Sequence, residues 1–541
     1  MEPKWLGVLR HLDVFYGRLR AAHLFFLPSY LPKSPAELVL KTMKTCIETW
    51  GLHIASSQVA GARGFRVVAL APVIAAASVV LIASPLPAAT PNWNSYLHDA
   101  KHSSFNAGTA TFTPTASGSI VKNWAFTAAP STQTGNAFVA SPTVSNGVVY
   151  IGSINGIFYA VNENSGTELW HKNLGVTGQS PCAAGAVKGI SSTAAVAPDS
   201  SGQLTVYVGG GDGYLYALRA SDGTVVWRKF VVDVSQGAGG YNWASPTVTG
   251  GHVYMGISSN CDNPLVRGGI KDFDQATGTL LRTYWSVPKG SDNLGGSVWT
   301  SPASDGTSVW ATIGNSMETQ SNVGDCFAIV RLDVATLTRQ DRWIVPNTAG
   351  TDLDWGSSPT LFDATLNGTL TTMVGAANKN GIFYAFKAND LASGPVWSRK
   401  LGAPGDEGTV KTKGLLLAAA IWDFKDHRLF VASNKTHIAG LATLGSVREL
   451  NPATGAVIWA TPLSGFVMGS PSMSAGGVIA AATYNNAAGA MNFVYLLDAS
   501  DGSVVKTIQE DASIFAQPVF ADTHLFVATT GGVLTAYSVA P

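Results

Sequence analysis

The chain has 541 residues, of which 46% are hydrophobic and 13% are charged, and its formal net charge is zero. The length permits a large core, and the sparsely charged composition lacks the basic surface or charged tail that nucleic-acid binding would need. The 58 glycines and 15 tryptophans indicate many turns and aromatic strands, as in an all-β repeat protein.

The first part of the chain does not show the strand pattern of the rest. Residues 1–58 contain helix-like patches, and we interpret them either as sequence upstream of the native start or as a cytoplasmic extension before an anchor. Within residues 59–89, two arginines precede the apolar run Val67–Ala83, which small residues follow. This order predicts an exported protein with a cleaved signal peptide or a short membrane anchor. Residues 90–119 then lead into the repeats.

One unit repeats over residues 120–541. Its clearest copy, from Ser141 to Trp170, reads Ser-Pro-Thr-Val, an apolar strand, a Gly-containing turn, a Tyr-Ala-Val strand, Ser-Gly-Thr and finally Trp. Short β-rich segments bounded by Gly, Asn and Asp predict four strands in each unit. A four-stranded unit with a period of this length is typical of a propeller blade.

The ends of the repeats predict the number of blades. They fall at Trp124, Trp170, Trp227, Trp285, Trp343, Trp397 and Trp459, and at Lys506 in the Trp place. We interpret these tryptophans as wedges between neighbouring blades.

The two ends of the repeat region complement each other. One strand, Ile120–Phe126, precedes the first repeat end, and three strands, Gln517–Phe520, His524–Ala528 and Val533–Ser538, follow the last. Together they complete one blade. The sequence therefore predicts an all-β, eight-bladed propeller closed by an N-terminal strand with three C-terminal strands. A β-sandwich array would not explain such complementary ends.

Polar residues that occur once, rather than in every repeat, carry the functional signal. Trp299 in Gly-Ser-Val-Trp-Thr-Ser-Pro and Asn315 in Ile-Gly-Asn resemble two motifs of the quinoprotein alcohol dehydrogenases, which depend on pyrroloquinoline quinone (PQQ). The resemblance covers residues 90–541 and is nearest to the polyvinyl-alcohol-dehydrogenase-like branch. It implies that Trp299 lies under PQQ and that Asn315 binds Ca²⁺.

Four further positions carry the same resemblance. Asp354, in Asp-Trp-Gly-Ser-Ser-Pro, stands where the family has the carboxylate that takes the substrate's hydroxyl proton and approaches the metal. Lys379, in Lys-Asn-Gly-Ile-Phe-Tyr, matches a cation beside the quinone oxygens. Asn434 matches an Asn that contacts the quinone, and Lys188 stands where an Arg binds the quinone carboxylates.

The sequence also departs from the family. Ala183 follows Cys182 where the family has a vicinal Cys pair, and since export favours disulfides, we expect Cys182 to pair with Cys261 instead. The family's Glu ligand of Ca²⁺ aligns with Asn263, so that Asp262 and Asn263 are the candidate metal ligands there.

Two functions are compatible with these residues. The resemblance implies a PQQ- and Ca²⁺-dependent dehydrogenase that oxidises a small-molecule or polymeric alcohol and passes electrons to a separate acceptor. The departures favour a non-catalytic propeller that binds or assembles envelope proteins. Both place the protein in the periplasm, in the cell envelope or outside the cell.

Overall fold

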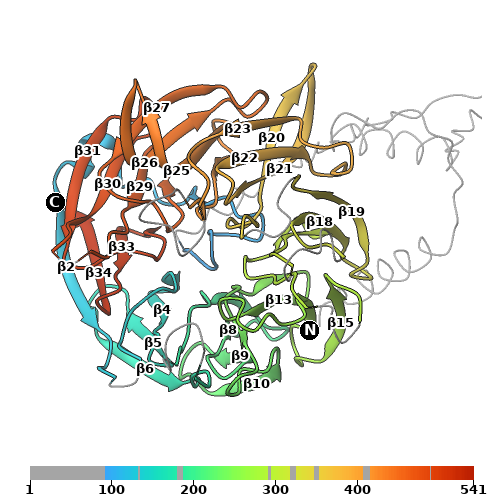
Figure 1. Ribbon diagram of the computed structural model, residues 1–541. Coiled ribbons are helices and arrows are strands. Elements are labelled where there is room, and N and C mark those ends of the chain that lie inside the picture. Colours follow the sequence, from blue (N-terminus) through green and yellow to red (C-terminus); the bar gives the residue numbers. More distant parts are fainter. Residues whose placement is uncertain are drawn as a thin grey trace, which may run out of the picture. The chain divides into compact units, whose positions relative to one another are not determined.

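Eight β-sheets follow one another along the chain, and each is one blade of a propeller (Figure 1). The computed structural model describes residues 92–131, 134–179, 187–289, 294–316, 324–346, 352–405, 415–487 and 489–540. Apart from β1, which pairs parallel with β28, neighbouring strands of a blade pair antiparallel, as in the order β3-β4-β5-β6 of blade 1. The predicted all-β, eight-bladed fold is confirmed.

The blades are numbered in chain order. Blades 1 to 4 contain β3 (Thr143–Ser145), β4 (Val148–Gly152), β5 (Ile157–Asn162) and β6 (Glu168–Asn173); β7 (Ala195–Pro198), β8 (Leu204–Gly209), β9 (Tyr214–Arg219) and β10 (Val225–Phe230); β11 (Gly240–Tyr241), β12 (Thr247–Thr249), β13 (His252–Ser259), β14 (Gly269–Asp274) and β15 (Leu280–Trp285); and β16 (Ala303–Ser304), β17 (Ser308–Thr312), β18 (Ala328–Asp333) and β19 (Arg339–Ile344). Blades 5 to 8 contain β20 (Thr360–Leu366), β21 (Thr369–Asn378), β22 (Ile382–Lys387) and β23 (Trp397–Lys400); β24 (Ile421–Asp423), β25 (Arg428–Ile438), β26 (Leu441–Leu450) and β27 (Val457–Leu463); β1 (Phe105–Asn106), β28 (Ser472–Ser474), β29 (Val478–Ala482), β30 (Asn492–Asp498) and β31 (Val504–Glu510); and β2 (Ile120–Thr127), β32 (Val519–Ala521), β33 (His524–Ala528) and β34 (Val533–Val539). One short helix, α3 (Pro114–Ser117), precedes β2.

Blade 8 closes the ring from both ends of the repeat region. The N-terminal strand β2 pairs antiparallel with β34, from Ile120 opposite Val539 to Thr127 opposite Val533, and the two strands lie side by side in Figure 1. Strands β33 and β32 complete the sheet. The predicted closure by one N-terminal and three C-terminal strands is therefore what the structure shows.

Tryptophans at the start of the outer strands join neighbouring blades. In blade 1, the Trp170 Nε1 donates a hydrogen bond to Ala220 O in blade 2 at 3.0 Å. The indole ring lies so close to Gly223 that a Cβ there would approach it to 2.6 Å, and Gly223 also has a φ of +69°. Trp124, Trp227, Trp397 and Trp459 donate to the next blade in the same way.

Two of the predicted repeat ends are wrong in register. In blade 1, Trp170 is the first paired residue after the bulge of the outer strand. The same position holds Arg282 in blade 3 and Asp341 in blade 4. Trp285 and Trp343 therefore lie further along their strands. The neighbouring turns explain both changes. Leu337 replaces the glycine against which a tryptophan from blade 3 would lie, and Asp341 Oδ2 accepts a hydrogen bond from the Leu391 N–H at 2.5 Å.

Hydroxyl groups link the blades around the central channel. At the start of the inner strands, each of several backbone N–H groups donates to the hydroxyl of the corresponding residue in the next blade. The pairs are Gln517–Ser141, Ser141–Thr193, Thr193–Ser245, Ser245–Ser301, Ser301–Ser358 and Ala419–Ser470, at 2.9 to 3.0 Å. This contact explains why Ser-Pro recurs in the repeat.

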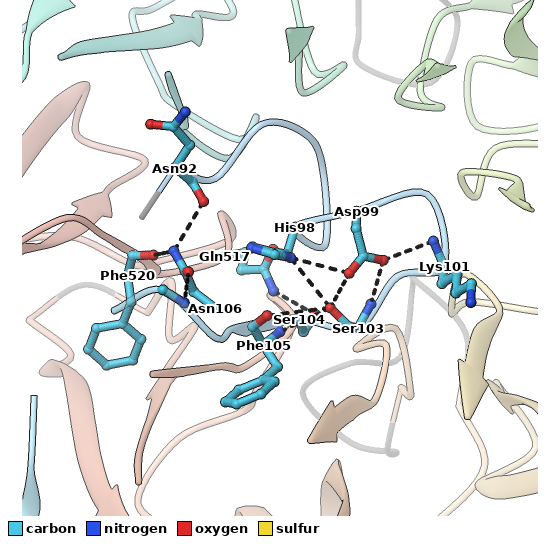
Figure 2. A network of polar contacts seen from close by, with 11 residues as sticks. Asn92, His98, Asp99, Lys101, Ser103, Ser104, Phe105, Asn106, Gln517 and Phe520 are labelled. Carbon is cyan, nitrogen blue, oxygen red and sulfur yellow. Dashed lines mark hydrogen bonds and ion pairs between the residues drawn. The ribbon is translucent and has the colours of Figure 1, made fainter. Parts of the chain in front are cut away.

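Residues 92–106 form a strap that passes from blade to blade. Its backbone bonds to blades 1, 2, 4, 5, 6 and 7, and β1 adds a parallel strand to β28. Figure 2 shows the strap's polar contacts, among them the Asn106 amide that donates to Asn92 O and to Phe520 O of blade 8. The strap thus ties blades far apart in sequence together.

The predicted extension (1–58) and signal peptide or anchor (59–89) lie outside the described residues and remain predictions. Among the helices of the described residues, none is long and apolar enough to cross a membrane.

Candidate functional site

A cavity of about 560 Å³ is lined by residues from all eight blades and therefore lies at the centre of the ring. Trp299 and Lys379 line it, and Asp354 is buried directly behind them. The Trp299 Nε1 donates to Asp354 Oδ2 at 3.1 Å, and Lys379 Nζ lies 2.8 Å from Asp354 Oδ1. The structure therefore brings these three residues together.

Local backbone pairing fixes the arrangement of Asp354 and Lys379. Lys379 follows the end of β21, and its backbone N–H donates to Asp354 O at 3.0 Å. Next to them, Trp355 pairs with Asn378 in an isolated β-bridge, and the buried Trp355 Nε1 donates to Phe327 O at 2.8 Å. The ion pair is thus built on two anchored segments.

A second aspartate, Asp352, belongs to this wall, although its sequence motif predicted no role for it. Asp352 Oδ1 lies 2.8 Å from Lys379 Nζ, and the Asp352 side chain is 32% exposed and lines the cavity. Asp354, with a side chain 2% exposed, does not itself line the cavity. The sequence Asp352-Leu353-Asp354 could have indicated the role of Asp352, because one lysine can contact two carboxylates that are two residues apart.

The Asp354 carboxyl of this wall has a raised pKa. Burial raises the pKa of the Asp354 carboxyl to about 7, while Lys379 lowers it and the charges of Asp352 and Asp262 raise it further. Asp262 is exposed and also lines the cavity. Two carboxylates thus contact the Lys379 ammonium group, and that of Asp354 is poised to bind or release a proton near neutral pH.

Asn434 does not line the cavity, and its predicted contact with a quinone stays a prediction. The side chain is buried, and its Nδ2 donates to Leu415 O at 2.5 Å and to Val467 O at 3.2 Å. Its Oδ1 accepts from the Val467 N–H at 2.7 Å. The amide is therefore used in holding two backbone segments together.

Three other predicted ligands, Lys188, Asn315 and Asn263, also lie outside the cavity lining. Lys188 Nζ lies over the Trp243 ring, 4.9 Å from its centroid, and Trp243 itself lines the cavity. Asn315 is half-buried, and its carbonyl accepts from the Gly296 N–H at 2.7 Å. Asn263 is exposed. Of the predicted metal ligands, Asp262 alone contributes to the lining.

Cys261 lines the cavity and is disulfide-bonded, whereas Cys326, the other described cysteine, is free and buried. The expected partner, Cys182, lies outside the described residues, so the pairing stays a prediction.

The fold and the central cavity define an eight-bladed propeller with a charged site on its axis. The family pattern "Glucose/ethanol/alcohol dehydrogenase, beta-propeller domain", a PQQ type, matches residues 93–321. The pattern "Outer membrane protein assembly factor BamB" matches residues 443–540. The propeller is thus similar to PQQ-repeat propellers, among them those of the quinoprotein alcohol dehydrogenases. No curated protein sequence matches it.

Solved structures agree with this class. The quinohemoprotein alcohol dehydrogenase from Comamonas testosteroni superposes with a TM-score of 0.65 at 16% identity, covering 84% of this chain and 81% of that one. A europium-containing methanol dehydrogenase gives 0.67 at 15% identity, with 83% and 98% covered. BamB from Moraxella catarrhalis gives 0.50 at 15% identity, with 77% and 99% covered. At these identities the likeness shows the fold alone.

Proposed function

We propose that the protein is an exported, quinone-dependent alcohol dehydrogenase. The observation that carries the proposal is the Asp354 carboxylate, which is held between the Trp299 indole and the Lys379 ammonium at the wall of the central cavity. A buried carboxylate with a raised pKa and a fixed cation beside it suits the removal of a proton from an alcohol.

The cavity fits PQQ in size and in part of its lining. A volume of about 560 Å³ lies within the range of cofactor sites. Trp299 and Trp243 offer indole rings to a flat ligand, and Lys379 offers a cation to its oxygens. When bound, PQQ would supply an acceptor for the hydride that leaves the alcohol carbon.

The residues fit Ca²⁺ in charge but not in arrangement. Asp352 and Asp354 supply two carboxylates, yet Lys379 occupies the space between them. The described residues contain no group of three or more His, Cys, Asp or Glu side chains arranged to hold a metal. We therefore assign no step to a metal ion.

The chain's own residues divide the chemistry among them. Asp352 is the carboxylate that a hydroxyl in the cavity meets first, and Asp354 is the one whose pKa lies near 7. Lys379 Nζ contacts Asp352 Oδ1 and Asp354 Oδ1. Its charge stabilises either carboxylate, and also negative charge that develops on the oxygen of a nearby alcohol. We propose that this carboxylate pair accepts the hydroxyl proton. The two electrons of the hydride, which PQQ would take up when bound, would then pass to a separate acceptor.

Two features support export. The predicted signal peptide or anchor in residues 59–89 would carry the propeller out of the cytoplasm. The disulfide at Cys261 agrees with an oxidising compartment.

The test is reconstitution of the purified chain with PQQ, with and without Ca²⁺. We expect quinone absorbance that survives desalting and alcohol-dependent reduction of a dye. Asp354→Asn should retain the absorbance and lose dye reduction by at least a hundredfold. Loss of the absorbance in the unsubstituted chain would overturn the proposal, and full activity of D354N would show that another group takes the proton.

A binding or assembly role in the cell envelope is the second candidate. The BamB-type match over residues 443–540 favours it, as does the long hairpin β25–β26, whose tip exposes Leu441 by 75%. This function becomes the better one if the chain retains no quinone.

A further inference from the structure

The central cavity has two unlike walls. Blades 3 to 5 supply the charged wall, formed by Asp262, Asp352 and Lys379 together with the indole of Trp299. The segments that begin blades 6 and 8, and two loops of blade 7, supply a second wall with five apolar or aromatic side chains. This apolar wall consists of Leu415, Leu417, Met468, Tyr484 and Phe515.

The apolar wall is a continuous packed surface that reaches the charged wall. Leu415, Leu417 and Met468 belong to one cluster of buried residues, and Tyr484 and Phe515 pack against it. The rings of Tyr484 and Phe515 meet edge to face, with centroids 5.9 Å apart. Trp299, whose Nε1 bonds to Asp354, packs against the same cluster. An apolar surface therefore begins beside the reactive carboxylates.

The fold holds this wall in place through Asn434. The Asn434 amide bonds to the backbone of Leu415 and to both the N–H and C=O of Val467, next to Met468. Asn434 is fully buried, so these bonds do not compete with water. The wall is thus formed before a ligand arrives, which is what selective binding requires.

From these two walls we infer that the substrate is an alcohol with an apolar body of at least the size of a phenyl ring, rather than methanol or a sugar. The inference rests on the proposed function. An apolar body would cover the five side chains while its hydroxyl group meets Asp352 and Lys379. A sugar would place hydroxyls against Leu415, Leu417, Met468 and Phe515, which offer no strong hydrogen-bond partner, and this weakens its binding.

The inference is tested by binding to the full chain without turnover. The probes are benzyl alcohol, methanol and glucose, each titrated by isothermal calorimetry. We expect benzyl alcohol to bind at least about tenfold more tightly than either of the others. Met468→Gln, which puts an amide into the apolar wall, should weaken benzyl alcohol binding by about tenfold. The control Met491→Gln makes the same change at a side chain that is 61% exposed and should not alter it.

Phe515→Gln, at a half-buried position, replaces M468Q if that variant does not fold. Equal binding of benzyl alcohol and glucose, or equal binding by M468Q and M491Q, would refute the inference. A different result would contradict the proposed function: benzyl alcohol would bind as expected but would not be oxidised by the PQQ-loaded chain. Oxidation of methanol and benzyl alcohol with the same kcat/KM would leave the function standing and remove the substrate class.

Discussion

Asp354 and Asn434 show how similar positions in the sequence take different parts in the structure. Both are polar, both are buried, and both occur once rather than in every blade. The Asp354 carboxylate meets side chains at the cavity wall, whereas the Asn434 amide meets backbone groups of two neighbouring segments. A buried amide that satisfies backbone groups in this way is structural.

Asn434→Ala should therefore lower the free energy of unfolding by about 3 kcal/mol, because it leaves the N–H and C=O of Val467 and the C=O of Leu415 without their partner. Urea denaturation measures the change. Asn164→Ala, at an exposed position in a turn of blade 1, is the control and should change stability by less than about 0.5 kcal/mol. Equal midpoints for the two variants would contradict the structural role.

His102, in the strap, gives the fold a defined response to acid. Its ring is buried, and its Nδ1 lies 2.8 Å from Pro359 O, to which it donates. Burial lowers the pKa of His102 from 6.5 to about 4, against the opposing effects of Pro359 and Asp99. Between these two values the unfolded chain binds a proton that the folded chain does not, so stability falls as pH falls.

We expect this loss to approach about 3 kcal/mol and to stop below pH 4. His102→Gln keeps a neutral donor and should make the unfolding midpoint less dependent on pH between 6.5 and 4. His437→Gln, at an exposed histidine, should leave the dependence as it is. An unchanged slope in H102Q would show that other groups cause the acid response.

Among the elements, a wedge tryptophan occurs only where the next blade has a turn that can receive its indole ring. Each needs a hairpin turn with a glycine and a free carbonyl, as Gly223 and Ala220 provide for Trp170. Blade 8 has no such turn, because the connection between β34 and β2 is where the repeat region begins and ends. This explains why Lys506, in blade 7, stands in the Trp place.

Trp170→Ala should lower the free energy of unfolding by about 3 kcal/mol, because it removes the indole that joins blades 1 and 2. Lys506→Ala changes the equivalent position in blade 7 and should change stability by less than about 0.5 kcal/mol. Thermal or urea unfolding of both variants measures the difference. A loss in K506A as large as that in W170A would mean that the position matters for a reason other than the wedge.

The sequence predicts the elements better than the site. Recurrent Ser-Pro, Gly and Trp residues define the blades because each makes the same contact in blade after blade. Trp285 and Trp343 gave a wrong prediction of strand register because they lie just beyond the wedge position. Arg282 and Asp341 occupy that position in blades 3 and 4. Leu337 in place of a glycine was the signal that no tryptophan precedes it there.

The site depends on how segments from different blades converge, which no local pattern encodes. Motif resemblance brought Trp299, Asp354 and Lys379 together, and the structure places them in contact. The same resemblance included Asn315 and Lys188, which do not line the cavity. The apolar wall escaped prediction because its residues belong to no repeated motif.

At the scale of the whole molecule, two devices hold the ring closed. Blade 8 joins β2 to the three C-terminal strands, and the strap bonds to blades across the ring. The devices meet at Gln517, whose N–H donates to Ser141 Oγ in blade 1 and whose Nε2 donates to Ser104 Oγ in the strap (Figure 2). Closure packs both faces of blade 8 against its neighbours, blades 1 and 7.

Deletion of residues 517–541 should therefore destabilise all eight blades rather than one. It removes β32, β33 and β34, leaves β2 without a partner, and uncovers two buried clusters that blade 8 shares with blades 1 and 7. Because each blade is stabilised by its neighbours, the loss should spread around the ring. We expect the truncated chain to lose its cooperative unfolding transition, and limited proteolysis should cut in every blade. Deletion of residues 540–541 alone, beyond β34, is the control and should unfold at nearly the same temperature as the complete chain. A truncated chain that keeps a sharp transition and protease resistance in blades 2 to 6 would show that the blades are stable without closure.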